Sequence, residues 1–302
     1  MIRAAIVTAG ELWRQGGLGE RALYLSGAFM IVSGLLHVPV YLFDDLPWEG
    51  AVSWRKPILF GLSTGVTFLS LGWVLSCLLH RRRRWVAYAG VVVALAGLVE
   101  VGLITMQAWR GVPSHFNTET AFDTAVHIGI DVLIGVITLG IVALTIRSLM
   151  PIRAGASDTR FAIRAGMIWL LLSCLFGFWM LVYGTPRAME GLDPGVYGEA
   201  GLIKFVHGMP IHALQFLPVS AWVMLRWGVP ERSRLLSLHA MNVAILMLTV
   251  YASIQTFAGR DRFDVTMVSL GFLVVAGVCL LIVTVIAVVG RSATTPTSRA
   301  SP

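Results

Sequence analysis

The sequence has 302 residues, of which 57% are hydrophobic and only 13% are charged. Soluble domains usually carry about 25% charged residues, so this composition excludes a soluble fold and predicts a chain embedded in lipid. The formal net charge of +7 indicates no nucleic-acid partner, because the arginines gather in alternate loops between apolar segments. We therefore predict an all-α integral membrane protein whose immediate partner is the lipid bilayer.

Eight apolar segments are long enough to cross a bilayer as helices. A spanning helix needs about 20 residues, and these segments lack the alternation of apolar and polar residues that a membrane β-barrel requires. They cover roughly residues 22–43, 57–79, 85–109, 122–147, 162–183, 202–225, 235–257 and 265–289. The chain is therefore expected to cross the membrane about eight times.

The distribution of basic residues predicts the orientation of the chain. The two terminal segments and alternate loops together hold sixteen of the 23 Lys and Arg residues, whereas the remaining loops and their flanks hold seven. Loops rich in Lys and Arg stay on the cytoplasmic side. We therefore predict a multi-pass protein of the plasma (inner) membrane, with the N-terminus and the C-terminus both cytoplasmic.

Three matching features recur in the same order in the two halves of the chain. They are Lys56 and Lys204, then Gln107 and Gln255, then the dipeptides Phe122-Asp123 and Phe263-Asp264. The pattern predicts two tandem four-helix repeats, which are parallel because four spans return the chain to its starting side. The predicted order is a cytoplasmic or interfacial segment at 1–21, repeat 1 at 22–147, a cytoplasmic linker at 148–161, repeat 2 at 162–289 and a disordered cytoplasmic tail at 290–302.

Ionisable side chains inside a membrane span are costly and usually mark function, and six of those in the predicted spans are candidates. They are His37, Glu100, His127, Asp131, His207 and His212. The predicted orientation puts all six in the extracytoplasmic half of the membrane, so we expect them to line one polar pocket. The histidines have no counterparts in the other repeat, which favours one asymmetric site.

Asp123, His127 and Asp131 follow one another at intervals of four residues, which stacks them on one helix face. A carboxylate one turn from an imidazole can fix its tautomer, as it does for ligands of metals or haem. Alternatively, Asp123 caps its helix and His127 is an interfacial polar residue. The preceding loop holds Arg110 and His115, and it is either a lid over the site or an ordinary surface loop.

The segment from Lys204 to Gln215 contains Pro210, which removes one backbone hydrogen bond and kinks the helix. Its histidines, His207 and His212, are either cofactor ligands or side chains satisfied by carbonyls that the kink frees. Gln215 shares a helix face with His212. Met209 adds a soft donor, so His207, Met209 and His212 form an alternative copper site.

The predicted architecture is similar to that of haem A synthases in its tandem four-helix units, eight spans, cytoplasmic ends and outward histidines. The Glu-x-x-His-Arg pattern of those enzymes is absent from this sequence, so the resemblance implies the architecture and not the activity. The sequence favours a membrane redox protein that binds haem b or a metal and has an electron-transfer partner. The alternatives are a solute or proton-coupled transporter and a non-catalytic accessory factor. Whether any cofactor is bound stays open.

The sequence thus yields a defined set of candidate site residues. The predicted cofactor ligands are His127, His212, His207 and His37, with His127 and His212 as the preferred axial pair for haem. The predicted supporting or pathway residues are Asp131, Glu100, Asp123, Gln107, Gln215, Gln255, Lys56, Lys204, Arg110 and His115.

Overall fold

The computed structural model describes residues 10–11, 13–78, 84–152 and 155–294, and it divides the chain into two compact units, residues 1–153 and 154–302. Hereafter these are unit 1 and unit 2. The predictions for residues 1–9, for the basic run at 79–83 and for the tail beyond 294 fall outside the described residues. Helix α10 extends to Thr294 and so includes the first residues of the predicted tail.

Eight helices in the described part of the chain are long and apolar enough to cross a membrane. They confirm the eight predicted spans, so the chain is a polytopic membrane protein. They are α2 (Leu18–Phe43), α3 (Arg55–Leu78), α4 (Arg84–Trp109), α5 (Ala121–Leu149), α6 (Ser157–Met189), the pair α7 (Ile203–Ile211) and α8 (Ala213–Arg226), α9 (Glu231–Phe257) and α10 (Met267–Thr294).

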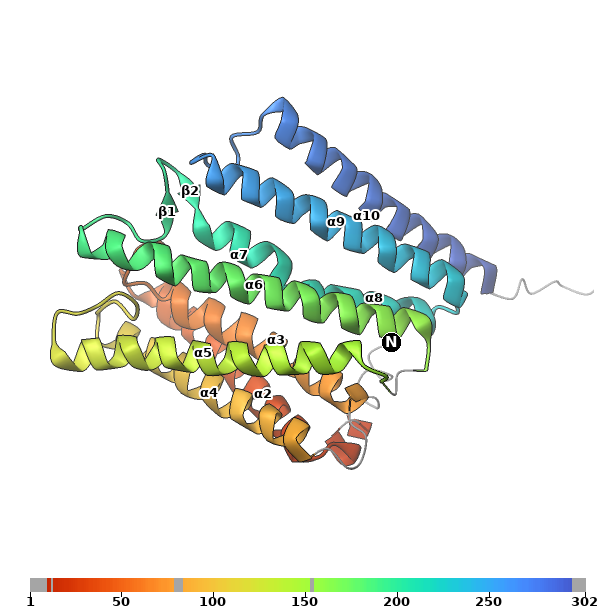
Figure 1. Ribbon diagram of the computed structural model, residues 1–302, viewed down its shortest axis with the longest axis horizontal. Coiled ribbons are helices and arrows are strands. Elements are labelled where there is room, and N and C mark those ends of the chain that lie inside the picture. The colour runs from red at the N-terminus through yellow and green to blue at the C-terminus, as the bar shows by residue number, and fades with distance from the viewer. Residues whose placement is uncertain (1–9, 12, 79–83, 153–154, 295–302) are drawn as a thin grey trace, which may run out of the picture. The chain divides into compact units, whose positions relative to one another are not determined.

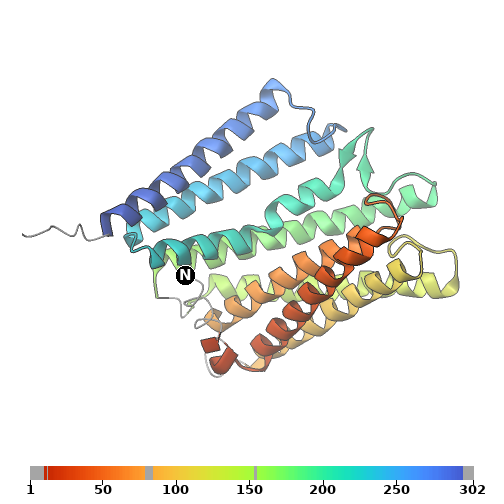
Figure 2. The same cartoon turned by 180° about the vertical axis from the view of Figure 1, so that it is seen from behind.

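In unit 1, α2, α3 and α4 pack on one another, and α5 packs mainly on α4 (Figures 1 and 2). Helices α2 and α3 approach closely because small residues face each other along their contact. A Cβ added to Gly27 would lie 2.7 Å from the carbonyl oxygen of Gly65, and one added to Gly61 would lie 2.9 Å from Cα of Gly34. Such contacts are typical of helices that associate in a membrane.

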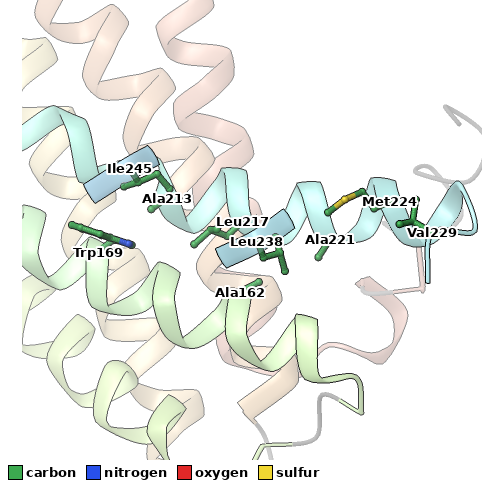
Figure 3. Close-up of a cluster of buried hydrophobic side chains, with 9 residues drawn as sticks. All are labelled: Ala162, Trp169, Ala213, Leu217, Ala221, Met224, Val229, Leu238 and Ile245. Carbon is green, nitrogen blue, oxygen red and sulfur yellow. The ribbon is translucent and has the colours of Figure 1, made fainter. Parts of the chain in front are cut away.

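In unit 2, α6, the α7–α8 pair and α9 pack together, and α10 packs mainly on α9 (Figures 1 and 2). A cluster of nine buried apolar side chains joins α6, α8 and α9 and includes Trp169, Leu217 and Leu238 (Figure 3). The Trp169 indole donates a hydrogen bond of 2.7 Å to Oδ1 of Asn242. At the N-terminal end of α6, Nε of Arg234 lies 2.5 Å from Oδ2 of Asp158, and both side chains are buried.

The sixth span is broken between α7 and α8 at His212. Pro210 has no N–H to continue the helix ladder, and the break leaves carbonyl groups without helical partners. With its amide nitrogen facing these acceptors, Gln215 donates to the carbonyls of His212 (3.1 Å) and Ile211 (3.2 Å). The predicted kink is therefore present, and Gln215 contacts the backbone there.

Helices α4 and α9 end in the same kind of turn. The N–H of Val112 donates to the Gln107 carbonyl (3.1 Å), and the N–H of Arg260 donates to the Gln255 carbonyl (3.0 Å). The residue before each donor is a glycine with positive φ, +69° at Gly111 and +66° at Gly259. This is a Schellman turn, in which glycine avoids the Cβ clash of the left-handed conformation.

A short hairpin precedes α7 in unit 2. Its strands, β1 (Val196–Tyr197) and β2 (Gly201–Leu202), are antiparallel. The hairpin is joined to the end of α9, because the N–H of Ala200 donates to the Gly259 carbonyl and the Thr256 hydroxyl donates to the Leu202 carbonyl.

Candidate functional site

The loop between α4 and α5 in unit 1 is held in place by hydrogen bonds of its own. Asn117 donates from Nδ2 to the Pro113 carbonyl (3.2 Å) and accepts from the Glu119 N–H (3.1 Å). Phe116 adopts φ = +58°, a conformation that is unfavourable for a bulky side chain and that often occurs at functional sites. The loop is therefore a fixed structure.

Asp123 anchors the start of α5. Thr120 caps the helix by accepting from the Asp123 N–H (3.1 Å), and its hydroxyl donates to Oδ2 of Asp123 (2.6 Å). Gln107 Nε2 (2.9 Å) and Arg110 (2.6 Å) both donate to Oδ1 of Asp123, and Arg110 also donates to Gln107. These contacts give Asp123, Gln107 and Arg110 a structural role, although the residue that caps the helix is Thr120 and not Asp123.

Four titratable groups lie near these contacts and follow one another from α3 through the loop into α5. They are Lys56, His115, His127 and Asp131. Lys56 of α3 lies 3.5 Å from Oγ of Ser114, which lies 2.9 Å from Nδ1 of His115. The backbone N–H of the next residue along the loop, Phe116, donates to Nδ1 of His127 (3.4 Å).

One turn further along α5, Oδ2 of Asp131 lies 3.7 Å from Nδ1 of His127. The other carboxylate oxygen of Asp131, Oδ1, is buried and has no hydrogen-bond partner among the described residues. We call Lys56, Ser114, His115, His127 and Asp131 the outer relay.

The electrostatics of the outer relay keep His115 neutral. Burial lowers its pKa, and the charge of Lys56 and the proximity of His127 lower it further, to about 3. His115 lies in the loop and packs against the Phe60 ring of α3, with 6.0 Å between ring centroids. At neutral pH its imidazole therefore offers one N–H donor and one acceptor nitrogen.

The structure assigns both ring nitrogens of His37 to other protein groups. Nδ1 lies 2.7 Å from the Ser33 carbonyl, and Nε2 accepts from the Trp109 indole N–H at 3.0 Å. Trp54, whose ring centroid lies 5.8 Å from that of His37, is only 3% exposed and donates to Asp44. His37 therefore belongs to an aromatic cluster, and these contacts leave it no nitrogen for a cofactor.

Glu100 lies at the middle of α4 and is only 6% exposed. It makes no hydrogen bond or ion pair with another described residue, so the structure gives no link between it and the outer relay. Its position inside a span still fits a role in a pathway.

In unit 2, His207 is oriented by α6. Its Nδ1 lies 2.8 Å from the Ser173 carbonyl, and the Ser173 hydroxyl donates to the His207 carbonyl at 2.8 Å. This arrangement directs a proton to Nδ1 and leaves Nε2 as the free lone pair, which is the usual state of a ligating histidine. His212 lies at the break and contacts the Phe216 ring, with 6.3 Å between ring centroids. Met209 and Lys204 are partly buried on α7.

Gln255 fills the position in unit 2 that Gln107 fills in unit 1, but its partners differ. Its Nε2 donates to the backbone carbonyls of Asp264 (2.5 Å) and Asp261 (3.1 Å). Both glutamines are completely buried. Gln107 thus joins the end of α4 to the first turn of α5, whereas Gln255 joins the end of α9 to the loop before α10.

Sequence reasoning named most residues of the outer relay but missed some of the contacts. Ser114 and Ser173 were both missed, because a serine in a loop or in an apolar helix gives no signal. The bond from Trp109 to His37 joins residues that are 72 positions apart. No pattern within a single segment could predict it.

Among the described residues, no group of three or more His, Cys, Asp or Glu side chains lies close enough to hold a metal ion. Comparison with known proteins gives no relative: no family model, no curated protein and no solved structure matches the chain. The arrangement of the side chains is therefore the only guide to function.

Proposed function

We propose that this polytopic membrane protein is a proton-coupled transporter of a small solute, with the outer relay of unit 1 as the proton-binding part of its pathway. The observation that carries the proposal is Asp131. A carboxylate inside a membrane span is costly and is usually retained for function. Asp131 has one oxygen turned to His127 and one buried oxygen without a partner among the described residues.

The outer relay can hold a proton at alternative positions. When His127 is neutral, its Nδ1 accepts from the Phe116 N–H. When His127 is protonated, Nδ1 becomes a donor, gives up that bond and pairs with Asp131, 3.7 Å away. The proton state of His127 is thus coupled to the loop through Phe116, which would let proton binding alter access to the site.

The side of the membrane on which the relay lies is part of the proposal. The sixteen-to-seven division of Lys and Arg favours cytoplasmic termini and an extracytoplasmic loop between α4 and α5. A proton would then enter from outside through Ser114 and His115. Labelling of a cysteine introduced at Glu119, by a reagent that cannot cross the membrane, is expected in intact cells and would be absent if the chain were inverted.

The tandem repeat is proposed on the same basis. The ordered sequence matches are supported by the two equivalent turns after Gln107 and Gln255 and by a fourth helix that packs mainly on the third in each unit. We therefore propose residues 22–147 and 162–289 as two parallel repeats joined at 148–161. Only repeat 1 carries the outer relay.

A flux assay tests the transport proposal. The full chain is reconstituted in liposomes that contain a pH-sensitive dye, and the external pH is lowered in the presence of candidate solutes. Asp131→Asn is expected to reduce the solute-dependent proton flux at least tenfold. The matched control is Asp45→Asn, an exposed carboxylate of unit 1 on the same side, which should leave the flux unchanged. Equal fluxes in wild type and Asp131→Asn would contradict the proposal.

A second candidate function is a redox protein that binds haem b, and the orientation of His207 favours it. Its bond to the Ser173 carbonyl prepares Nε2 for iron, and copper could use the same nitrogen with Met209 nearby in sequence. An absorption spectrum and metal analysis of the purified protein test this function. A Soret band that disappears in His207→Ala supports haem, and a colourless metal-free protein rules against both cofactors.

A further inference from the structure

We propose that the outer relay binds a small oxyanion, such as a carboxylate or a phosphate, between Lys56, Ser114 and His115, and that this anion enters together with a proton. The inference rests on the proposed transport function and names the class of solute. Three hydrogen-bond donors of different kinds meet at this point: an ammonium group, a hydroxyl group and an imidazole.

The geometry of the donors suits an anion with several oxygens. The Ser114 side chain is the centre, with Nζ of Lys56 at 3.5 Å and Nδ1 of His115 at 2.9 Å. Ser114 is only 2% exposed, so an oxygen bound there would be largely shielded from water, where charge-assisted hydrogen bonds are strongest. The Phe60 and Phe116 rings flank His115 and fix its orientation.

The charged and titratable groups nearest His115 lie on α3 and α5. Lys56 approaches from α3 and His127 from α5, while Asp131 lies one turn further along α5 and is turned toward His127. At the junction of α4 and α5, Arg110 and Asp123 form an ion pair with each other. The net charge of the groups around His115 is therefore positive, and this favours an anionic ligand.

Anion binding would change the protonation of His115. Without a ligand, burial and Lys56 hold the pKa of this imidazole at about 3. A bound anion offsets the Lys56 charge and stabilises imidazolium, so it raises that pKa. Between pH 5 and the bound-state pKa, each anion that binds should take up a proton from solution, to a maximum of about one proton per anion. The solute and the proton would thus be linked at one residue.

Titration calorimetry on the full chain in detergent tests the inference, with sodium acetate and inorganic phosphate as probes and sodium chloride as the reference anion. Measurements at pH 5.5 in two buffers with different ionisation enthalpies give the number of protons taken up. We expect acetate or phosphate to bind with proton uptake, and the more tightly bound of the two identifies carboxylate or phosphate as the preferred group.

Variants assign the binding to these residues. Lys56→Gln should weaken binding of the anion at least tenfold, Lys56→Arg should restore most of it, and His115→Gln should abolish proton uptake. Arg262→Gln, which removes an exposed cation of unit 2, should bind as wild type does. A thermal unfolding curve of each variant confirms that it is folded.

The outcomes separate the two proposals. If neither acetate nor phosphate binds, or if both bind Lys56→Gln as well as they bind wild type, the anion site is wrong. If either anion binds as expected but no proton flux appears in liposomes, the site stands and the transport function fails. If protons flow but neither anion binds, the transport function stands and the proposal that the solute is an oxyanion is wrong.

Discussion

The ends of α4 in unit 1 and α9 in unit 2 have the same backbone turn but different side-chain partners. In both units, a buried glutamine near the end of the third helix and a glycine four residues later form the same turn. The glutamine side chain reaches α5 in unit 1 and the loop before α10 in unit 2. In unit 1, Gln107 binds the carboxylate of Asp123, and a loop with His115 covers the end. In unit 2, Gln255 binds only backbone carbonyls of a shorter loop. The two units share this turn, and in unit 1 it lies beside the outer relay.

The ion pairs of the two units offer the largest expected contrast in stability. The pair of Arg234 and Asp158 in unit 2 is buried on both sides, with 8% and 2% of the side chains exposed. In unit 1, the side chain of Arg110 is 38% exposed in its pair with Asp123.

Arg234→Met leaves Asp158 charged and buried, which should cost about 3–5 kcal/mol of unfolding free energy. Arg110→Met should cost less, because the Arg110 side chain is already partly in water and Asp123 keeps its hydrogen bonds from Gln107 and Thr120. Denaturation of both variants in detergent measures the difference. Equal losses would mean that burial does not distinguish the two pairs.

A smaller contrast concerns the pH dependence of stability. The folded-state pKa of His115 lies at about 3, below the value of about 6.5 in an unfolded chain. As the pH falls below 6.5 the unfolded state binds the proton first, so stability decreases, by at most about 1.4 kcal/mol per pH unit, until the pH reaches the folded pKa.

His115→Gln should therefore lose less stability than wild type between pH 6.5 and pH 4.5. The melting temperatures of the two proteins at both pH values check this, and subtraction removes the effect of the carboxylates common to both. A loss of the same size in the two proteins would show that His115 is already protonated in the fold.

The smallest expected effects come from the two glycines of the shared turn. Ala at either position must adopt a left-handed conformation, which costs roughly 1–2 kcal/mol. At Gly111 the added Cβ meets nothing within 4 Å, whereas at Gly259 it would lie 3.3 Å from Cα of Gly198 in the hairpin. Gly259→Ala should therefore destabilise more than Gly111→Ala. Denaturation curves measure both losses of stability. A larger loss in Gly111→Ala would show that the hairpin can move away from the added Cβ at little cost.

Much of the fold follows from the sequence alone, because a bilayer imposes strict rules. Long apolar runs had to be helices, and the break in the sixth span was predictable from Pro210. The partners of the polar groups were less predictable. His37 and His127 have similar positions near span ends, yet His37 is bonded at both nitrogens by Ser33 and Trp109, and only His127 has a carboxylate beside it. Such differences depend on packing between distant segments.

The comparison also divides the predicted cofactor ligands by role. In the proposed relay His127 exchanges a proton with Asp131, 3.7 Å away, whereas the tautomer of His207 is set by its bond to the Ser173 carbonyl. If the protein is a transporter, replacing His127 should reduce its activity and replacing His207 should not. A haem-based function predicts the opposite order.

The most direct test of the central claim is the solute-dependent proton flux of His127→Gln and His207→Gln, measured in parallel in the same liposomes and corrected for the amount of folded protein. If the outer relay of unit 1 carries the proton, His127→Gln should lose at least nine-tenths of the flux, and His207→Gln should stay within a factor of two of wild type. Full flux in His127→Gln, or a loss confined to His207→Gln, would contradict the account.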